Sequence, residues 1–497
     1  MRGALMVCGT SSDAGKSAVV AGLCRALHRR GVRVAPFKAQ NMSLNSVVTA
    51  DGHEIGRAQA MQAAAAGVEP EAAMNPVLLK PSSETECQVI VLGRPVGHLS
   101  AAAYHAKKPE LFGTVLDALA DLRARYDVVL LEGAGSPAEI NLLDRDIVNL
   151  PLAVAAGIKA IVIGDIDRGG VFAALYGTVA LLPADQRACV GGFVVNKMRG
   201  DSALLFDGTE QLARRTGVPT LGVLPYVTGI ALDAEDSLAL AGAPPRPATS
   251  RQTVLDVAAI RWPHLANATD LDPLAIEPGV GVRWVDHAAA LGQPDLVVLP
   301  GTKTTIADLA WLNANGLGDS IARTDAVVLG ICGGYQALGR TISDPDGAET
   351  TAGTRVAGLG WLDVETTFSR DKTLHRRRGT AYGVPVSGYE IHHGQTVPAP
   401  GVRPWLALDT PAGGPGNEGA TTSGNRAVFG TNLHGLFEAD DFRRAMLCEV
   451  ARLRGVPFTP SPTSFAASRE SQLDRLGDLV EEHLDMPAIC RLILEVR

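Results

Sequence analysis

Ala4-Leu-Met-Val-Cys-Gly-Thr-Ser-Ser-Asp-Ala-Gly-Lys-Ser17 is the stretch that decides the class of the N-terminal half of the chain. An apolar run leads into a glycine-bounded loop, and a helical pattern follows from Ser17 to a stop at Gly31. This order is what a phosphate-binding loop requires, because backbone amides and the helix N-terminus then face the anion. Five residues separate Gly9 from Gly15, one more than in the common form. The sequence therefore predicts a nucleotide-binding α/β domain.

The residues of this loop are the first candidate ligands for ATP. Lys16 is expected to neutralise the terminal phosphates, and the Ser17 hydroxyl is expected to reach Mg²⁺. Asp13 is a second candidate metal ligand. A chance Gly-Lys-Ser turn is the alternative, which the order of strand, loop and helix disfavours. The loop residues expected around the nucleotide are Thr10, Ser12, Asp13, Ala14, Gly15, Lys16 and Ser17.

Polar residues also end several other apolar runs of this half. Glu132 and Asp165 are hard oxygen ligands that suit Mg²⁺, while Lys38 is a cation suited to hold a transferring phosphoryl group. Asn196 and Lys197 end a further run. Each residue alone fits a helix cap or a solvated ion pair. Because parallel strands bring their carboxyl ends to one sheet edge, we expect all five to converge on the nucleotide.

Gly330-Ile-Cys-Gly-Gly-Tyr-Gln336 is the decisive stretch of the second half. It places Cys332 between an apolar run and a helical pattern, with small residues on both sides. Such a sharp strand-to-helix turn exposes a nucleophile, as in the Gly-x-Ser-x-Gly elbow. A buried structural thiol is the alternative, but packing alone does not require this turn.

A histidine and two backbone amides complete the expected thiol site. Three of the eleven histidines lie near strand ends in this half: His392, His393 and His434. We choose His434, in Asn432-Leu-His-Gly-Leu-Phe437, as the base that activates Cys332. The amides of Gly301 and Gly333 are the expected oxyanion donors. An ordinary strand-end histidine is the alternative for His434.

Two doubly wound α/β domains with a helical appendage are the fold that the alternating apolar runs predict. The expected strands are residues 4–8, 32–37, 128–132, 160–164, 192–196 and 220–224, then 254–260, 281–285, 296–299, 326–330 and 428–431. Segments 341–357 and 398–425 are expected to be irregular, because they are polar or rich in proline and glycine. The expected parts are residues 1–240 (the domain of the phosphate loop), 241–252 (linker), 253–441 (the domain of the Cys332 turn) and 442–497 (helical tail).

Composition excludes several functional classes. The formal net charge of −8 argues against a nucleic-acid partner. Seven scattered cysteines without a Cys-x-x-Cys pair argue against disulfides or a zinc site and favour a reducing compartment. No apolar stretch reaches the roughly 18 residues of a membrane span, and the N-terminus lacks a signal-peptide pattern. We expect a cytoplasmic protein without a membrane partner, and the oligomeric state stays open.

Together these residues resemble the cobyric acid synthase family of cobalamin biosynthesis over essentially the whole chain. The motifs of the first half are Thr10–Ser17, Phe37-Lys-Ala-Gln-Asn-Met-Ser43, Gly164-Asp-Ile-Asp-Arg-Gly-Gly-Val-Phe172 and Val195-Asn-Lys-Met-Arg-Gly-Asp201. Those of the second half are Leu299-Pro-Gly-Thr-Lys-Thr-Thr-Ile-Ala-Asp-Leu309, Gly388-Tyr-Glu-Ile-His392 and Asn432-Leu-His-Gly435.

This resemblance implies a dethiobiotin-synthetase-like ATP domain fused to a class I, flavodoxin-like glutamine amidotransferase domain. It implies amidation of the b, d, e and g carboxylates of adenosylcobyrinic acid a,c-diamide, with glutamine, ATP and the corrinoid as substrates and Mg²⁺ as the metal. Ammonia released at Cys332 would displace phosphate from an acyl phosphate.

Two positions depart from the wider families. Ser11 stands where an aspartate often follows the first Gly-Thr, so Asp13 or an acid from Asp165 and Asp167 must complete the metal site. Leu436 stands where class I glutaminases place a glutamate two residues after the histidine. A Cys332–His434 dyad is therefore expected, with Glu390 or Glu438 as alternatives for orienting the imidazole.

Two rival functions stay open at this stage. One is the sister enzyme that amidates the a and c acetates of cobyrinic acid. The other is an ATPase switch of the partitioning type that carries an inactive glutaminase-like platform; the intact Cys332 turn counts against it. The basic run His375-Arg-Arg-Arg378 either recognises the corrinoid carboxylates or is a solvated surface run.

Overall fold

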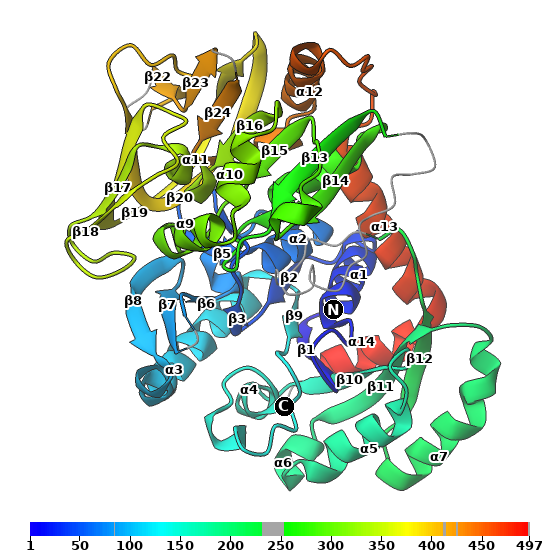
Figure 1. Cartoon of the computed structure of the whole chain (residues 1–497). Helices are drawn as coiled ribbons and strands as arrows, with labels where there is room; N and C mark the ends of the chain where they lie inside the picture. Colours follow the sequence, from blue (N-terminus) through cyan, green and yellow to red (C-terminus); the bar gives the residue numbers. More distant parts are fainter. Residues whose placement is uncertain (84, 231–252, 411–413, 424–425, 496–497) are drawn as a thin grey trace. The chain divides into compact units, whose positions relative to one another are not determined.

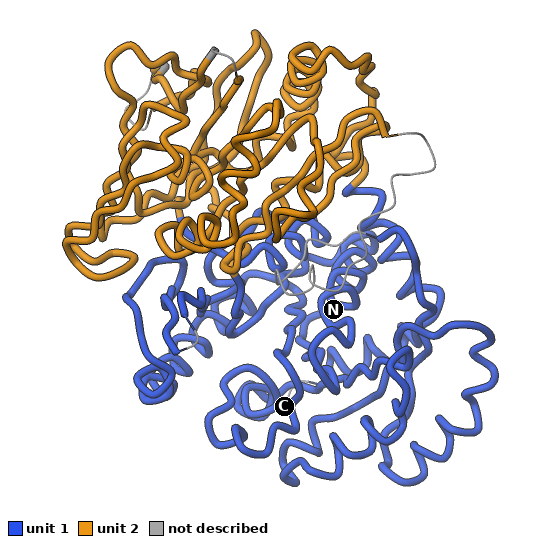
Figure 2. The backbone as a smooth tube through the Cα atoms, in the orientation of Figure 1, with its two compact units in different colours: residues 1–43, 53–233, 469–497 blue, residues 44–52, 234–468 orange. Residues whose placement is uncertain are grey.

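The computed structural model describes residues 1–83, 85–230, 253–410, 414–423 and 426–495. It divides into two compact units (Figure 2). Unit 1 comprises residues 1–43, 53–233 and 469–497, and unit 2 comprises residues 44–52 and 234–468. The predicted linker 241–252 lies outside the described residues.

Unit 1 is built on a six-stranded parallel sheet (Figure 1). Its order is β12-β11-β10-β1-β9-β2, and every neighbouring pair runs parallel. The strands are β1 (Gly3–Gly9), β2 (Val34–Phe37), β9 (Val128–Glu132), β10 (Lys159–Asp165), β11 (Val190–Met198) and β12 (Thr220–Pro225). These are the six strands predicted for the first half, because apolar residues covered on both faces form continuous runs.

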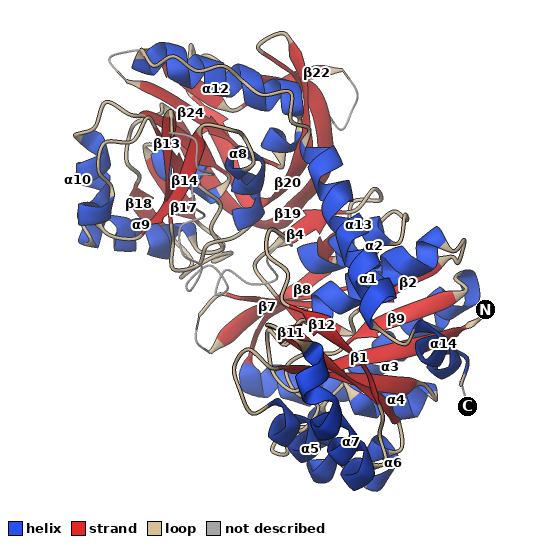
Figure 3. Cartoon of the chain, turned by 90° about the vertical axis from the view of Figure 1, so that its right-hand side faces the viewer, coloured by secondary structure: helices blue, strands red, loops and turns tan. Residues whose placement is uncertain are grey.

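Helices cover both faces of this sheet (Figure 3). One face holds α1 (Lys16–Arg29), α2 (Arg57–Ala65), α14 (Met486–Leu494) and the part of α13 (Phe465–His483) that belongs to unit 1. The other holds α3 (Ala101–Arg125), α4 (Leu150–Ala156), α5 (Val171–Leu181), α6 (Ala184–Arg187) and α7 (Phe206–Thr216). Arg25 of α1 pairs with Asp474 of α13 at 2.8 Å.

A second, smaller sheet in unit 1 was not predicted. It has the order β3-β6-β7-β8. Its strands are β3 (Gln40–Met42), β6 (Val77–Pro81), β7 (Glu86–Val91) and β8 (Arg94–Ser100), and a 3-10 turn, η1 (Ala72–Met74), precedes β6. The strands are short and mixed in polarity, so their stability depends on pairing that the local sequence does not reveal.

The central sheet of unit 2 has the order β14-β13-β15-β16-β24-β23. Its parallel strands are β13 (Leu255–Ile260), β14 (Val280–Val285), β15 (Leu296–Leu299), β16 (Val327–Ile331) and β24 (Ala427–Thr431), and β23 (Ala420–Ser423) is an antiparallel edge. In chain order the parallel strands follow 2-1-3-4-5, the flavodoxin-like arrangement. All five were predicted.

Short helices and one long helix flank this central sheet. They are α8 (Asp272–Ala275), α9 (Thr305–Ala314), α10 (Leu317–Ala322), α11 (Gly333–Leu338) and α12 (Asp440–Arg454). Buried side chains of α12, among them Phe442 and Met446, pack with Leu329 of β16 in one core cluster. Helix α12 thus belongs to unit 2, whereas α14 packs on β1 of unit 1, so residues 442–497 do not form a single appendage.

A second sheet of unit 2 corrects two predictions. Its main path is β18-β17-β19-β20-β25, and β21 and β22 extend it from β19. The strands are β17 (Thr341–Asp344), β18 (Thr354–Ala357), β19 (Val364–Ala381), β20 (Val384–Pro398), β21 (Leu406–Asp409), β22 (Pro415–Glu418) and β25 (Leu433–His434). Segments 341–357 and 398–425, predicted to be irregular, therefore contain strands. Pairing with β19 stabilises β17 and β21 despite their polar surroundings.

No helix among the described residues is long and apolar enough to cross a bilayer.

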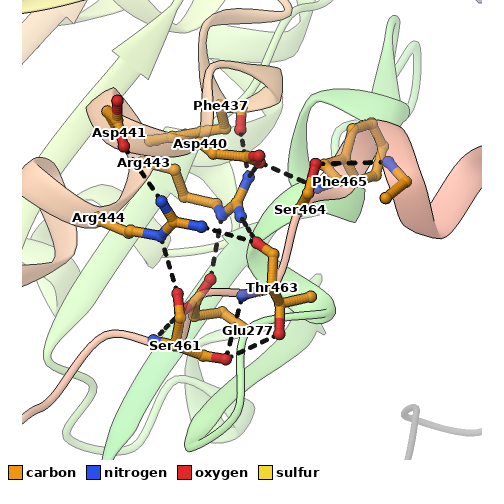
Figure 4. A network of polar contacts seen from close by, with 11 residues as sticks. Glu277, Phe437, Asp440, Asp441, Arg443, Arg444, Ser461, Thr463, Ser464 and Phe465 are labelled. Carbon is orange, nitrogen blue, oxygen red and sulfur yellow. Dashed lines mark hydrogen bonds and ion pairs between the residues drawn. The ribbon is translucent and has the colours of Figure 1, made fainter.

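A buried arginine, Arg443 of α12, binds residues from several segments of unit 2 (Figure 4). The Arg443 side chain is fully buried, and its Nε lies 3.2 Å from a carboxylate oxygen of Glu277, which is also fully buried. The guanidinium also donates to Asp440 at 2.8 Å and to the Thr463 carbonyl at 2.9 Å. Glu277 in turn accepts from the Ser461 amide at 2.7 Å. One cation therefore fixes the start of α12 and the segment before α13.

Replacing Arg443 with Met should lower the free energy of unfolding by about 3–5 kcal/mol, because Glu277 is left as a buried charge without its cation. Chemical denaturation of the purified protein measures this. The control is Arg452→Ala, which breaks the exposed pair with Glu449 and should cost less than about 1 kcal/mol. Equal effects of the two substitutions would contradict the structural role of Arg443.

Candidate functional site

The phosphate loop of unit 1 joins β1 to α1 through strained backbone. Gly15 has φ +102° and Asp13 has φ +58°. A Cβ at Gly15 would overlap the side-chain amide of Asn196, so glycine is required at this point. The Lys16 ammonium donates to the carbonyls of Ser11 and Gly135 at 2.9 and 3.1 Å. The loop is thus closed around its own lysine, and the role of Lys16 in phosphate binding stays a prediction.

Glu132, at the end of β9, is the centre of the charged residues beside this loop. One of its oxygens accepts from the Ser17 hydroxyl at 2.9 Å and from the Lys38 ammonium at 3.0 Å. The other accepts from the side chain of Gln62. Burial alone would raise the pKa of Glu132, but the Lys38 ammonium and these hydrogen bonds hold it below its ordinary value. The carboxylate therefore stays charged inside the protein.

Asp165, Asn196 and Lys197 lie at the next two strand ends. Lys197 donates to Asp165 at 2.7 Å and to the carbonyl of Asp13 at 2.7 Å. Asn196 donates to the carbonyl of Ala14 at 2.9 Å. The Thr10 amide bonds the Ile163 carbonyl at 2.9 Å, which ties the loop to β10.

The residues predicted from five strand ends thus lie at one sheet edge, in two sets. Ser17, Lys38 and Glu132 form one set, and Asp13, Asp165, Asn196 and Lys197 form the other. The carboxylate of Asp13 is largely exposed and lies 3.5 Å from Arg168, while Asp167 pairs with Arg199 at 2.6 Å. Gln62 was not predicted, since it stands in no recognised motif, and Arg168 lies in the motif 164–172 but was assigned no role. Within the described residues, no group of three or more His, Cys, Asp or Glu side chains is placed to hold a metal.

In unit 2, Cys332 occupies the turn between β16 and α11 with φ 51° and ψ −110°, a conformation that non-glycine residues rarely adopt. Its amide donates to the Thr431 carbonyl at 2.7 Å, and its sulfur lies 3.7 Å from the Ile391 carbonyl. A Cβ at Gly334 would overlap the Leu299 carbonyl. The glycines after the cysteine are therefore required by close backbone approach, as in a nucleophile elbow.

His434 lies beside Cys332, and a residue that was not predicted holds its ring. The His434 Nδ1 lies 2.6 Å from a carboxylate oxygen of Asp270, and the other oxygen accepts from the Gly435 amide at 2.8 Å. Burial alone would lower the pKa of His434, but the Asp270 carboxylate and the neighbouring Cys332 raise it to about 10. Tyr389 stacks on the imidazole with ring centroids 5.5 Å apart. The ring is therefore cationic at neutral pH and fixed in orientation.

Asp270 is the acid that orients the imidazole, a role for which the sequence offered Glu390 and Glu438 as alternatives. Glu390 instead pairs with Arg377 at 2.7 Å. Asp270 precedes α8 and is 164 positions from His434 in the chain. The acid just before a short helix resembles an ordinary cap, so only the fold identifies it.

Gly301 and Gly333, the predicted oxyanion donors, come close to the same centre. A Cβ at Gly301 would lie 2.9 Å from Cε1 of His434, and one at Gly333 would lie 3.0 Å from the backbone nitrogen of Thr302. Asp308 anchors this loop, because it accepts from the Thr302 hydroxyl and pairs with His264 at 2.8 Å. Gly301 thus lies beside the imidazole, and Gly333 directly follows Cys332 in the chain.

Unit 2 also contains a cavity of about 560 Å³. It is lined by polar residues that include His392, Glu418 and Asn432. Burial lowers the pKa of His392 to about 4, so its ring is neutral at pH 7. Glu418 accepts from the Asn432 amide at 2.8 Å, and burial raises the pKa of Glu418 to about 7.

The arginines of the basic run 375–378 make different contacts. Arg376 donates to the Val48 carbonyl at 2.8 Å, and Arg377 turns toward Glu390. Arg378 is exposed. A role of this run in corrinoid binding stays a prediction.

Comparison with known proteins assigns each half of the chain to a domain family. The family model for the CobQ/CobB/MinD/ParA nucleotide binding domain matches residues 5–239, and that for the CobB/CobQ-like glutamine amidotransferase domain matches residues 256–442. A cobyric acid synthase of Streptomyces coelicolor is 54% identical, with 99% of this chain and 97% of the relative aligned. One of Rhodococcus jostii is 54% identical over 98% and 95%. A solved glutamine amidotransferase covers 40% of this chain at 14% identity with a TM-score of 0.29.

The two matched models and the full-length relatives cover both halves of the chain. They establish the α/β fold class, a nucleotide-binding first half and a glutamine amidotransferase second half. The chain belongs to the cobyric acid synthase family, the ligases that carry out glutamine-dependent amidation in cobalamin biosynthesis.

Proposed function

We propose that the protein amidates the b, d, e and g carboxylates of adenosylcobyrinic acid a,c-diamide, using ATP and ammonia released from glutamine. The observation that supports this most strongly is the presence of two complementary sites in one chain. Cys332, His434 and Asp270 form a nucleophile with a held base, and Lys16, Lys38 and Glu132 surround a phosphate loop. Neither site alone would convert a carboxylate into an amide.

In the glutaminase half, the Cys332 sulfur attacks the side-chain amide of glutamine. His434 donates a proton to the leaving ammonia and then accepts one from the water that hydrolyses the thioester. Asp270 keeps the imidazole in one tautomer and orientation through Nδ1. The amides of Gly301 and Gly333 stabilise the oxyanion.

In the synthetase half, the phosphate loop holds ATP so that a corrinoid carboxylate attacks the γ-phosphorus. Lys16 and Lys38 neutralise the charge that develops on the transferring group. Ammonia then adds to the acyl carbon of the acyl phosphate, and inorganic phosphate leaves. Activation is needed because a carboxylate anion is a poor electrophile for ammonia.

We also propose that Ser17 and Glu132 hold Mg²⁺. Both offer hard oxygens, and they lie 2.9 Å apart at the end of the loop. The ion would neutralise phosphate charge. Asp165 remains an alternative ligand, because Lys197 engages its carboxylate at 2.7 Å much as Lys38 engages that of Glu132 at 3.0 Å.

The two rival functions are disfavoured on different grounds. The a and c acetates of cobyrinic acid remain an alternative acceptor, which the relatives named as cobyric acid synthases disfavour. An ATPase switch with an inactive platform needs no thiol beside a held imidazole, so the Cys332–His434–Asp270 arrangement disfavours it. Mass spectrometry of the a,c-diamide incubated with ATP, Mg²⁺ and glutamine separates these functions by the stepwise conversion of carboxyls to amides. An unchanged corrinoid would refute the proposal.

Replacing Cys332 with Ala should abolish glutamine hydrolysis and glutamine-driven amidation, because the nucleophile is lost. Amidation with high ammonium at mildly alkaline pH should persist, because ATP is bound elsewhere in the chain. Glutamate release and corrinoid mass measure the two activities. Hydrolysis of glutamine by the variant would show that the nucleophile is another residue.

Replacing Asp270 with Asn should lower kcat for glutamine hydrolysis by about 10²–10⁴-fold, the range typical of a mispositioned acid–base group. Loss of the carboxylate removes the main interaction that raises the pKa of His434 against burial. The imidazolium is then lost at lower pH, so the alkaline limb of the pH profile should move to lower pH. Asp272→Asn, two residues along, serves as the control, and an unchanged alkaline limb in Asp270→Asn would refute the assignment.

Replacing Lys16 with Ala should abolish amidation with glutamine and with ammonium alike, because phosphate neutralisation precedes either nitrogen source. Phosphate release and corrinoid mass are the readouts. Lys159→Ala, which removes a lysine from the opposite end of β10, is the matched control and should retain both activities. Amidation by the Lys16 variant at the parent rate would remove this residue from the mechanism.

A further inference from the structure

Residues 44–52, which we call the strap, are encoded within the first half of the chain but belong to unit 2 (Figure 2). The strap contains a short strand, β4 (Ser46–Val48). Asn45 and Ser46 are fully buried, and Thr49 is 1% exposed. Such burial of polar side chains indicates a built part of the unit rather than a surface loop.

The strap is hydrogen-bonded to the turn that carries Asp270. The Ser46 amide donates to the side-chain oxygen of Asn267 at 2.9 Å, and the Ala268 amide donates to the side-chain oxygen of Asn45 at 3.2 Å. Asn267 has φ +53°, a left-handed conformation that asparagine tolerates better than most residues. Asn45 of the strap thus binds the backbone of the Asp270 turn, and Asn267 of that turn binds the backbone of the strap.

From this turn the path to the thiol site is short. Asn267 and Ala268 open the 3-10 turn η5 (Ala268–Leu271), and the Asp270 amide donates to the Asn267 carbonyl at 3.0 Å. Asp270 then holds His434 at 2.6 Å. A shift of Asn45 would therefore move the carboxylate that orients the catalytic imidazole.

The strap also contacts the second sheet of unit 2. Arg376 of β19 donates to the Val48 carbonyl at 2.8 Å. The neighbouring strand β20 pairs with β25, where Tyr389 lies opposite His434. The strap thus reaches His434 by two routes, of which the Asp270 turn is the more direct.

The N-terminal end of the strap, which carries Asn45, follows directly from residues 38–43 of unit 1. Lys38 binds Glu132 at 3.0 Å, and the Ser43 amide donates to the Leu79 carbonyl of β6 at 3.0 Å. Leu44 alone separates Ser43, which is fixed in unit 1, from Asn45, which is fixed in unit 2. Residues 38–43 and the strap are therefore connected through a single residue.

We propose that Asn45 is a positioning residue for the glutaminase site, and that the strap makes glutamine hydrolysis depend on the state of residues 38–43. This inference rests on the proposed function, since it assumes that Lys38 contacts the transferring phosphoryl group. When ATP and the corrinoid engage that segment, the strap sets the Asp270 turn so that His434 is aligned with Cys332. Hydrolysis without an activated acceptor, which wastes glutamine, is thereby slowed.

The test compares glutamine hydrolysis by the full-length parent and by Asn45→Ala, each with and without ATP, Mg²⁺ and the a,c-diamide. In the parent, these ligands should raise kcat by a factor within about 5- to 150-fold, the usual range of coupling between two sites. In Asn45→Ala the stimulated kcat should fall to near the unstimulated level, with KM for glutamine little changed. The alkaline limb of the pH profile should also move to lower pH, because Asp270 holds His434 less firmly.

Two further variants separate positioning from packing. Thr49→Val removes a buried hydroxyl that donates to Asp51 within the same strap, and should retain the stimulation. Asn267→Ala should reproduce the effect of Asn45→Ala, and the double variant should be no worse than either single one, because both act on one turn.

Ammonium-driven amidation by Asn45→Ala should match the parent, which also shows that the variant is folded. Stimulation retained in Asn45→Ala, or lost equally in Thr49→Val, would overturn the role of Asn45. A parent whose glutamine hydrolysis ignores ATP and corrinoid would overturn the coupling. Absence of corrinoid amidation by the parent with either nitrogen source would instead overturn the proposed function.

Discussion

Both sites depend on one constraint: a parallel strand must end at the sheet edge in a turn that leaves no room for side chains. Gly15 and Gly334 show this directly, because a Cβ at either position would overlap the Asn196 amide or the Leu299 carbonyl. The chain can then begin a helix immediately, with its amides directed at the edge. Lys16 and Cys332 are placed by that turn, so their chemistry follows from the backbone before any neighbour contributes.

At each site, the neighbouring residues contribute a buried carboxylate paired with a cation. Glu132 and Lys38 are 0% and 3% exposed, and Asp270 and His434 are 1% and 2% exposed. Such pairs cost desolvation energy and are poor devices for stability. Each keeps a charge in the interior at a defined position, which acid–base and phosphoryl-transfer chemistry requires. The two units use the same physical solution for different reactions.

The sequence predicted what is local and missed what depends on distant pairing. All eleven strands of the two predicted parallel series are present, because residues buried on both faces form continuous apolar runs. Strands β17 and β21 were missed, since each is stabilised by β19 and not by its own composition. Asp270 was missed for the same reason: its partner His434 lies 164 positions away, and Leu436 occupies the position where a glutamate was sought.

The division of the chain into units also differs from its linear order, and this bears on why both activities share one polypeptide. The two family models match residues 5–239 and 256–442, which suggests a chain that could be cut between them. Such a cut would separate unit 2 from the strap and the hydrogen bonds of Asn45 to the Asp270 turn. It would also separate α1 from Leu476 and Val480 of α13, which are buried in its core cluster. The segment 44–52 and the residues from 469 onward are thus each encoded apart from the rest of the unit to which they belong, so the two units cannot be separated by a single cut in the chain.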